Sequence, residues 1–166
     1  MTSPLHRGLL ALALVGAMVG GAQFMEHVLG LDPCPLCLMQ RLWTIFAGVA
    51  ILLGLAHPRR NGYPIVALVC AAIGAVFSLR QLWLQHLPAD EVPACTPDMA
   101  YMIDAFPMSD ILRAMTYGTG NCAQVTWSLL GISIAGWALV GFVLLVGTTV
   151  FWLRSVREVA PHRSSG

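Results

Sequence analysis

Four long apolar runs, separated by short polar segments, dominate this sequence of 166 residues. They cover residues 8–26, 36–56, 63–84 and 127–152, and Trp127 and Trp152 bound the last run as interface tryptophans do. Each run is long enough to cross a bilayer as a helix, which takes about 17–25 residues. Only 10% of the residues are charged, against about 25% in soluble domains. We therefore predict an all-α membrane protein, a four-helix transmembrane bundle in a single domain.

The distribution of arginine predicts how the bundle is oriented. Six of the nine basic residues fall on the side that holds the chain ends and the 57–62 turn: Arg7, Arg59, Arg60, Arg154, Arg157 and Arg163. Because cytoplasmic loops are enriched in basic residues, we expect both termini in the cytoplasm and the 85–126 loop outside. The first run, with its basic start and Gly20-Gly21-Ala22, also resembles a signal peptide, which would leave this orientation unchanged.

The 85–126 segment carries a second pattern. Its apolar residues recur at about helical spacing: Met99, Met102, Ile103, Phe106, Ile111, Leu112 and Met115. This predicts either a short amphipathic helix on the membrane surface or an irregular loop with scattered apolar side chains. Pro107 would interrupt any continuous helix.

Topology sorts the five cysteines into two groups. Cys70 falls in the middle of the third run, and the outer loops hold Cys34, Cys37, Cys95 and Cys122. Disulfides persist outside the cytoplasm, so Cys34–Cys37 and Cys95–Cys122 are candidate disulfides. Cys70 is expected to act as a small buried apolar residue.

The Cys34–Cys37 pair has the spacing of a redox-active motif. Short Cys-x-x-Cys rings are typical of thiol–disulfide exchange. Cys37 is expected in the first turn of a helix, where unpaired N–H groups favour a thiolate, and Arg41 one turn later adds positive charge. The wider Cys95–Cys122 pair could exchange with a partner thiol. Alternatively, it could be purely structural and stabilise the fold by about 3–4 kcal/mol by constraining the unfolded chain. A four-cysteine zinc site is a further alternative, which the unequal spacings disfavour.

Polar residues at the outer helix ends predict a ligand pocket. Arg41 and Arg80 are expected at matching depths on the second and third helices, with Gln81 beside Arg80. Ionisable residues inside a membrane usually serve function, and arginine donors suit an apolar carrier with carbonyl oxygens, such as a quinone. The alternative for Arg41 is snorkelling to lipid headgroups. Glu26 and His27, near the outer end of the first helix, could line this pocket or be plain interfacial residues, and we expect the latter.

Three motifs together resemble a known family. Cys-Pro-Leu-Cys-x-x-Gln-Arg opens the second run, Arg-Gln-x-Trp-Leu-Gln-x-Leu-Pro closes the third, and Gly-x-Gly-Asn-Cys-Ala precedes the fourth. In this order, over nearly the whole chain, they are similar to the bacterial disulfide-bond formation protein B (DsbB) family. The resemblance implies an inner-membrane protein-disulfide:quinone oxidoreductase. Such an enzyme reoxidises a periplasmic DsbA-like thiol oxidase and passes two electrons to ubiquinone or menaquinone.

The resemblance also implies a role for each outer cysteine. Cys95 would be attacked by reduced DsbA, and Cys122 would be released. Cys122 would then exchange with the Cys34–Cys37 bond at Cys34. Cys37 would emerge as the thiolate that faces the quinone, with Arg41 supporting its charge.

The chain departs from the family pattern in two places. Gln81 stands where some members carry a histidine near the quinone, so no histidine role is expected there. Ser133-Ile134-Ala135-Gly136-Trp137 replaces the Ser-Met-Pro-x-Trp that enters the fourth helix in many members, so this helix could begin or bend differently.

Two other functions share parts of the pattern. A vitamin K epoxide reductase-like protein also has four helices and a Cys-x-x-Cys, but there the motif typically lies near the last helix. A small transporter with structural disulfides should carry an ionisable residue deep in a helix, whereas Glu26, Arg41 and Arg80 lie near the outer boundary. A net charge of +1 gives no sign of nucleic acid binding.

Overall fold

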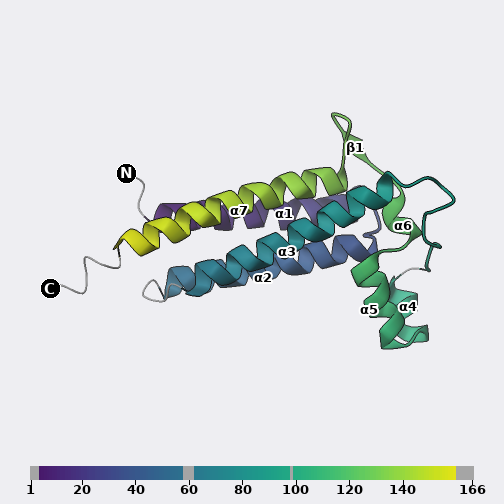
Figure 1. Cartoon of the computed structure of the whole chain (residues 1–166), viewed down its shortest axis with the longest axis horizontal. Coiled ribbons are helices and arrows are strands. Elements are labelled where there is room, and N and C mark those ends of the chain that lie inside the picture. Colours follow the sequence, from purple (N-terminus) through teal and green to yellow (C-terminus); the bar gives the residue numbers. More distant parts are fainter. Residues whose placement is uncertain (1–3, 58–61, 98, 160–166) are drawn as a thin grey trace.

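Four long helices run the length of the molecule in the computed structural model (Figure 1). They are α1 (Pro4–His27), α2 (Pro35–Ala56), α3 (Gly62–Gln85) and α7 (Ile134–Val159). The structure describes residues 4–57, 62–97 and 99–159. Within these ranges, four helices are long and apolar enough to cross a membrane. The prediction of a four-helix, all-α membrane protein is confirmed.

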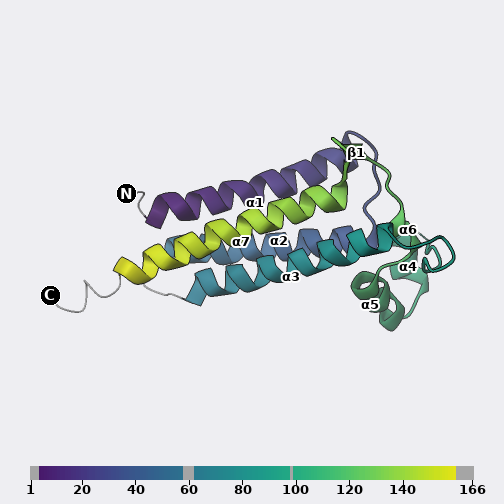
Figure 2. The same ribbon diagram turned by 45° about the horizontal axis from the view of Figure 1, so that its top comes forward.

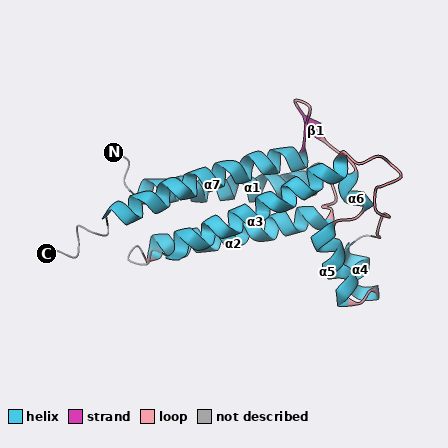
Figure 3. Ribbon diagram, in the orientation of Figure 1, coloured by secondary structure: helices cyan, strands magenta, loops and turns pink. Residues whose placement is uncertain are grey.

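The helices alternate in direction along the bundle, as Figures 1 and 2 show. One end holds the start of α1, the end of α2, the start of α3 and the end of α7. The opposite end holds the shorter elements and loops, which Figure 3 distinguishes by type. The predicted basic turn with Arg59 and Arg60, and also Arg163, lie outside the described residues.

The bundle interior combines small side chains with a few large ones. The buried cluster consists of Ala11, Val15, Ala47, Ala50, Ile51, Ala67, Cys70, Ala71, Phe142, Leu145 and Trp152. Cys70 is a buried core residue, as predicted. Trp152, predicted to bound the run as an interface tryptophan, is 2% exposed, so its ring packs against the neighbouring helices. The helix continues past it to Val159, which leaves Trp152 inside the bundle.

Glycines let the large side chains of α7 approach the neighbouring helices. The Phe142 ring packs directly over Gly74 of α3, where a Cβ atom would overlap it. On α2, a Cβ at Gly54 would lie 2.5 Å from Cη2 of Trp152. Without a hydrophobic driving force in lipid, close van der Waals packing at small residues holds membrane helices together. These two contacts therefore fix α7 against α2 and α3.

The last long helix begins later than predicted. Residues 127–133 were assigned to the helix from their apolar character. Residues 128–133 instead form a hairpin of β1 (Ser128–Leu129) and β2 (Ile132–Ser133). Its two-residue turn has positive φ at both Leu130 (54°) and Gly131 (77°), which suits the twist of a tight antiparallel hairpin. The helix then starts at Ile134.

The long outer segment contains two short helices in place of one. These are α4 (Met99–Ala105) and α5 (Met108–Tyr117), and Pro107 caps the second, so the predicted break at this proline is confirmed. Met102, Ile111 and Ala114 bury a small cluster between them. A one-turn helix, α6 (Gly120–Ala123), follows and carries the fourth outer cysteine.

Candidate functional site

Cys34 and Cys37 lie where the loop from α1 enters α2. Cys34 is the N-cap: its backbone is extended (φ −68°, ψ 161°) and its Sγ accepts a hydrogen bond from the Cys37 backbone N–H at 3.3 Å. Pro35 occupies the first helical turn, where its missing N–H costs nothing. The two sulfur atoms are 2.8 Å apart. This local geometry brings together the two thiols that the sequence paired.

Cys122 lies against Cys34, which the sequence spacing alone could not show. The α6 turn buries Cys122 completely, packed with Leu36, Leu84 and Cys34. A hydrogen bond from the Cys34 thiol lowers the pKa of Cys122 to about 6, although burial alone would raise it. The same bond raises the pKa of Cys34. The lowered pKa favours the thiolate form of Cys122, which packs against Cys34.

Cys95 is exposed and lies beside Gly120, the first residue of α6. The Gly120 N–H donates to the Ala94 carbonyl at 3.1 Å, and Asn121 Nδ2 donates to the Thr96 carbonyl at 2.8 Å. A Cβ on Gly120 would lie 2.8 Å from Cys95 Sγ and 2.5 Å from the Pro93 carbonyl oxygen. A side chain at position 120 would therefore push the segment around Cys95 away from α6. All five cysteines are free thiols in the structure, so the Cys34–Cys37 and Cys95–Cys122 disulfides stay predictions.

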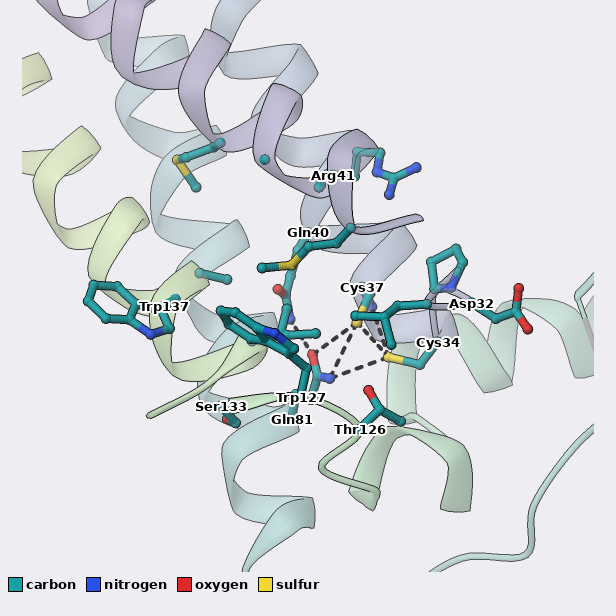
Figure 4. A pocket seen from close by; sticks show the side chains of 18 of the residues that line it. Asp32, Cys34, Cys37, Gln40, Arg41, Gln81, Thr126, Trp127, Ser133 and Trp137 are labelled. Carbon is teal, nitrogen blue, oxygen red and sulfur yellow. Dashed lines mark hydrogen bonds between the residues drawn. The ribbon is translucent and has the colours of Figure 1, made fainter. Parts of the chain in front are cut away.

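Gln81 of α3 contacts both sulfurs of the Cys-x-x-Cys motif. Its Nε2 lies 3.4 Å from Cys34 Sγ and 3.4 Å from Cys37 Sγ. Its Oε1 accepts a hydrogen bond from Gln40 Nε2 at 2.8 Å. Figure 4 shows these contacts converging on the motif. The sequence placed Gln81 in the pocket, and the structure brings it directly to the thiols.

A cavity of about 270 Å³ opens beside the sulfurs (Figure 4). Its polar lining includes Cys34, Cys37, Gln40, Arg41, Thr44, Gln81 and Gln85, and Trp127 and Trp137 line it from the hairpin side. Its apolar wall comes from α1 and α7: Ala17, Met18, Gly21, Ala22, Met25, Ala138 and Phe142. A Cβ at Gly21 would meet nothing within 4 Å. The two thiols therefore border a cavity whose α1 and α7 sides are apolar.

Arg41 lines this cavity and forms an ion pair with Glu26 of α1. Its Nη1 is 2.6 Å from Glu26 Oε2, and the two side chains are 17% and 27% exposed. In Figure 4 the guanidinium points away from the sulfurs, and its Nε is buried with no hydrogen-bond partner among the described residues. The expectation that Glu26 is a plain interfacial residue is wrong, because it neutralises the arginine of the site.

Arg80 does not reach the cavity. Its Nε donates to the Tyr117 carbonyl at the end of α5, 3.1 Å away, and its guanidinium stacks 4.4 Å from the Trp83 ring centroid. It is not among the residues that line the space beside the thiols. The structure thus brings Arg41 and Gln81 together at the predicted pocket and places Arg80 on the outer surface, where it holds α5 to α3.

Comparison with known proteins identifies the family. Residues 6–152 match the family described as "Disulfide bond formation protein DsbB". The chain belongs to this family. A "Disulfide bond formation protein B" of Hahella chejuensis is 45% identical over 151 residues, covering 88% of this chain and 91% of the relative. The namesake in Marinobacter nauticus is 45% identical over 166 residues, covering 98% and 97%. "Disulfide bond formation protein B 1" of Pseudomonas aeruginosa is 39% identical over 154 residues, covering 90% and 94%.

Family membership and structure together make this DsbB-family chain a membrane oxidoreductase of disulfide bond formation. Sequence reasoning missed Gln40 as a member of the site. Gln40 follows Cys37 by three residues, which places both on one helix face, and this was the available signal. Glu26 was considered for the pocket, but its ion pair with Arg41 had no signal in the sequence, because the two residues lie on different helices.

Proposed function

We propose that this DsbB-family chain is a quinone-linked thiol oxidase. It reoxidises a periplasmic DsbA-type disulfide donor and passes two electrons to ubiquinone or menaquinone in the membrane. The observation that carries the proposal is the arrangement of sulfurs: exposed Cys95, then buried Cys122 against Cys34, then Cys37 on the cavity. A relay of disulfide exchange needs this order, because each sulfur must react with the one before it and the one after it.

The first step takes place at the exposed cysteine. A thiolate of the reduced donor attacks Cys95 of a Cys95–Cys122 disulfide, a new bond to Cys95 forms, and the electron pair of the broken bond leaves on Cys122. Its lowered pKa makes Cys122 a good leaving group, because a more acidic thiol departs faster.

The second step transfers the electrons inward. The Cys122 thiolate attacks Cys34, so the Cys34–Cys122 bond forms, the Cys34–Cys37 bond breaks, and the electron pair goes to Cys37. The second donor thiol then releases the oxidised donor from Cys95. The released Cys95 thiolate attacks Cys122, so the Cys95–Cys122 bond re-forms, the Cys34–Cys122 bond breaks, and its electron pair goes to Cys34. Cys34 and Cys37 are left as the reduced pair.

The cavity fits a quinone ring. Within the described part of the chain, Arg41 Nε is a buried donor without a partner, and it belongs to a residue that lines the cavity with Cys37. Pockets for small molecules typically measure about 300–1,000 Å³, so a space of about 270 Å³ suits a ring whose tail continues into lipid. A quinone held there would supply the acceptor for the two electrons and two protons that Cys34 and Cys37 lose when they close their disulfide. Arg41 and Gln81 are the residues that would hold it.

Quinone reduction by the purified protein tests this function. With a reduced thioredoxin-fold oxidase as donor, we expect the quinone absorbance to fall, and each single replacement of Cys34, Cys37, Cys95 or Cys122 to abolish the change. No absorbance change with the intact protein would overturn the proposal.

The proposed location is the bacterial inner membrane, with both termini cytoplasmic and the cysteine pairs periplasmic. Exposed Cys95 provides the test. A membrane-impermeant maleimide added to spheroplasts should label it in the reduced protein. Labelling that requires membrane rupture would reverse the assigned orientation.

A further inference from the structure

Two buried carboxamides lie directly behind the Cys34–Cys37 motif. Gln40 of α2 is 6% exposed and Gln81 of α3 is 4% exposed. Burying an amide costs free energy unless its donors and acceptors find partners. The contacts of this pair therefore indicate what it contributes to the site.

The contact between the two amides sets the orientation of Gln81. Nε2 of Gln40 donates to Oε1 of Gln81 at 2.8 Å. If the Gln81 amide turned over, its NH₂ group would face the NH₂ group of Gln40, and two donors would meet. Gln40 therefore keeps the Gln81 oxygen toward itself and the Gln81 NH₂ group toward Cys34 and Cys37, 3.4 Å from each sulfur.

This orientation serves Cys37 in both of its protonation states. As a thiol, Cys37 donates its S–H to Gln81 Oε1 at 3.6 Å. As a thiolate, it accepts from Gln81 Nε2 at 3.4 Å. A carboxamide supplies both contacts without gaining or losing a proton.

We propose that Gln81 is a catalytic residue that stabilises the thiolate released at Cys37, and that Gln40 is the positioning residue that holds its NH₂ group in the donating orientation. The inference rests on the proposed exchange at Cys34. There the Cys34–Cys122 bond forms, the Cys34–Cys37 bond breaks, and its electron pair moves to the Cys37 sulfur. Donors already aimed at the place where charge develops lower the barrier, because they need no reorganisation.

Residue-resolved alkylation of Cys37 tests the pair. The full-length protein, fully reduced and free of quinone, is treated with iodoacetamide at neutral pH, and the modification of each cysteine is followed by mass spectrometry. Gln81→Leu should slow alkylation of Cys37 about tenfold, as expected for the loss of a hydrogen bond to a charged group. Gln40→Met should slow it about two- to threefold, since the broad amide torsion of Gln81 then samples both orientations.

The double variant separates positioning from general packing. If Gln40 acts through Gln81, then Gln40→Met should cost nothing further once Gln81→Leu is present. Losses that multiply would overturn the inference. Ser78→Ala is the matched control, because Ser78 is a buried polar residue on α3 whose hydroxyl donates to the Gly74 carbonyl at 3.2 Å. It should leave Cys37 alkylation unchanged.

Folding of each variant is checked by thermal unfolding in detergent. Should Gln40→Met not fold, Gln40→Asn poses the same question, because it keeps the amide but is one methylene too short for the contact. An unchanged alkylation rate in a folded Gln40 variant would refute the positioning role. The assay contains no quinone and no donor, so its outcome is independent of whether the protein reduces quinone.

Discussion

Replacement of Arg41 by methionine should impair the quinone step selectively. A hydrogen bond to a charged group contributes about 1.5–3 kcal/mol, which is a change of roughly 10- to 150-fold in rate constant at about 1.4 kcal/mol per tenfold. Arg41 forms an ion pair with Glu26 at 2.6 Å. Because the carboxylate neutralises the guanidinium, Arg41 attracts an electron-rich ligand less strongly than a free cation would. We therefore expect the lower part of this range, about a tenfold fall in kcat/KM for quinone.

Two measurements separate the steps. Quinone reduction is followed by absorbance at several quinone concentrations, and oxidation of the donor by Cys95–Cys122 is measured in a single turnover without quinone. Arg41→Met should leave the second rate within about twofold, because in that step the donor attacks the exposed Cys95, whereas Arg41 lines the cavity beside Cys37. Arg80→Met is the matched control: this arginine does not line the cavity, so quinone KM should not change. Equal losses in both steps would refute a quinone-site role for Arg41.

The Glu26 background makes the test sharper. In Glu26→Gln, the guanidinium loses its neutralising partner, so the cost of Arg41→Met on quinone kcat/KM should rise toward about 100-fold. If Arg41→Met costs the same with and without Glu26, the ion pair has no influence on the site.

Three further outcomes are expected. Cys70→Ala should retain donor oxidation within about twofold because its sulfur only packs in the core; a folded but inactive variant would contradict this. In the reduced protein, residue-resolved alkylation of Cys122 should rise through about pH 6 and level off above it, since a lowered pKa leaves the thiolate present above that value. Cys34→Ala should move this profile to higher pH by removing the donor, and an unmoved profile would exclude that bond as the cause. Gly74→Val should destabilise the bundle by about 1–3 kcal/mol in detergent unfolding, because α7 must move away. Gly147→Val should not destabilise the bundle, because a Cβ added there meets nothing within 4 Å. Equal losses of stability in the two variants would count against the packing argument.

Hydropathy predicted the bundle because crossing a bilayer requires long apolar helices. It failed at the entry to α7, since Trp127 and Leu129 are as apolar as any helix residue, while the turn at Leu130 and Gly131 depends on backbone conformation. The burial of Trp152 was not foreseen for a related reason. The charge-free run ends there, but the helix continues to Val159 and the ring packs inside the bundle.

The candidate site was predictable where its chemistry is local. Cys34, Cys37 and Arg41 share one helix start, so spacing alone brings them together. Contacts between helices were beyond reach: Glu26 joins Arg41 from α1, and Arg80 turns to α5 although its depth matches. The rotation of each helix about its axis determines which side chains meet across helices. The position of a residue along the membrane normal, which the sequence indicates, does not reveal that rotation.

The uneven packing of the bundle bears on how a substrate is supplied. Glycines meet large side chains tightly where α7 crosses α2 and α3, but Gly21 beside the cavity has open space around it. The cavity wall is apolar on its α1 and α7 sides, so a hydrophobic ligand would be delivered from the lipid phase. Its effective concentration is then its mole fraction in the bilayer. Saturation curves for this protein should therefore coincide when plotted per lipid and diverge when plotted per volume of water.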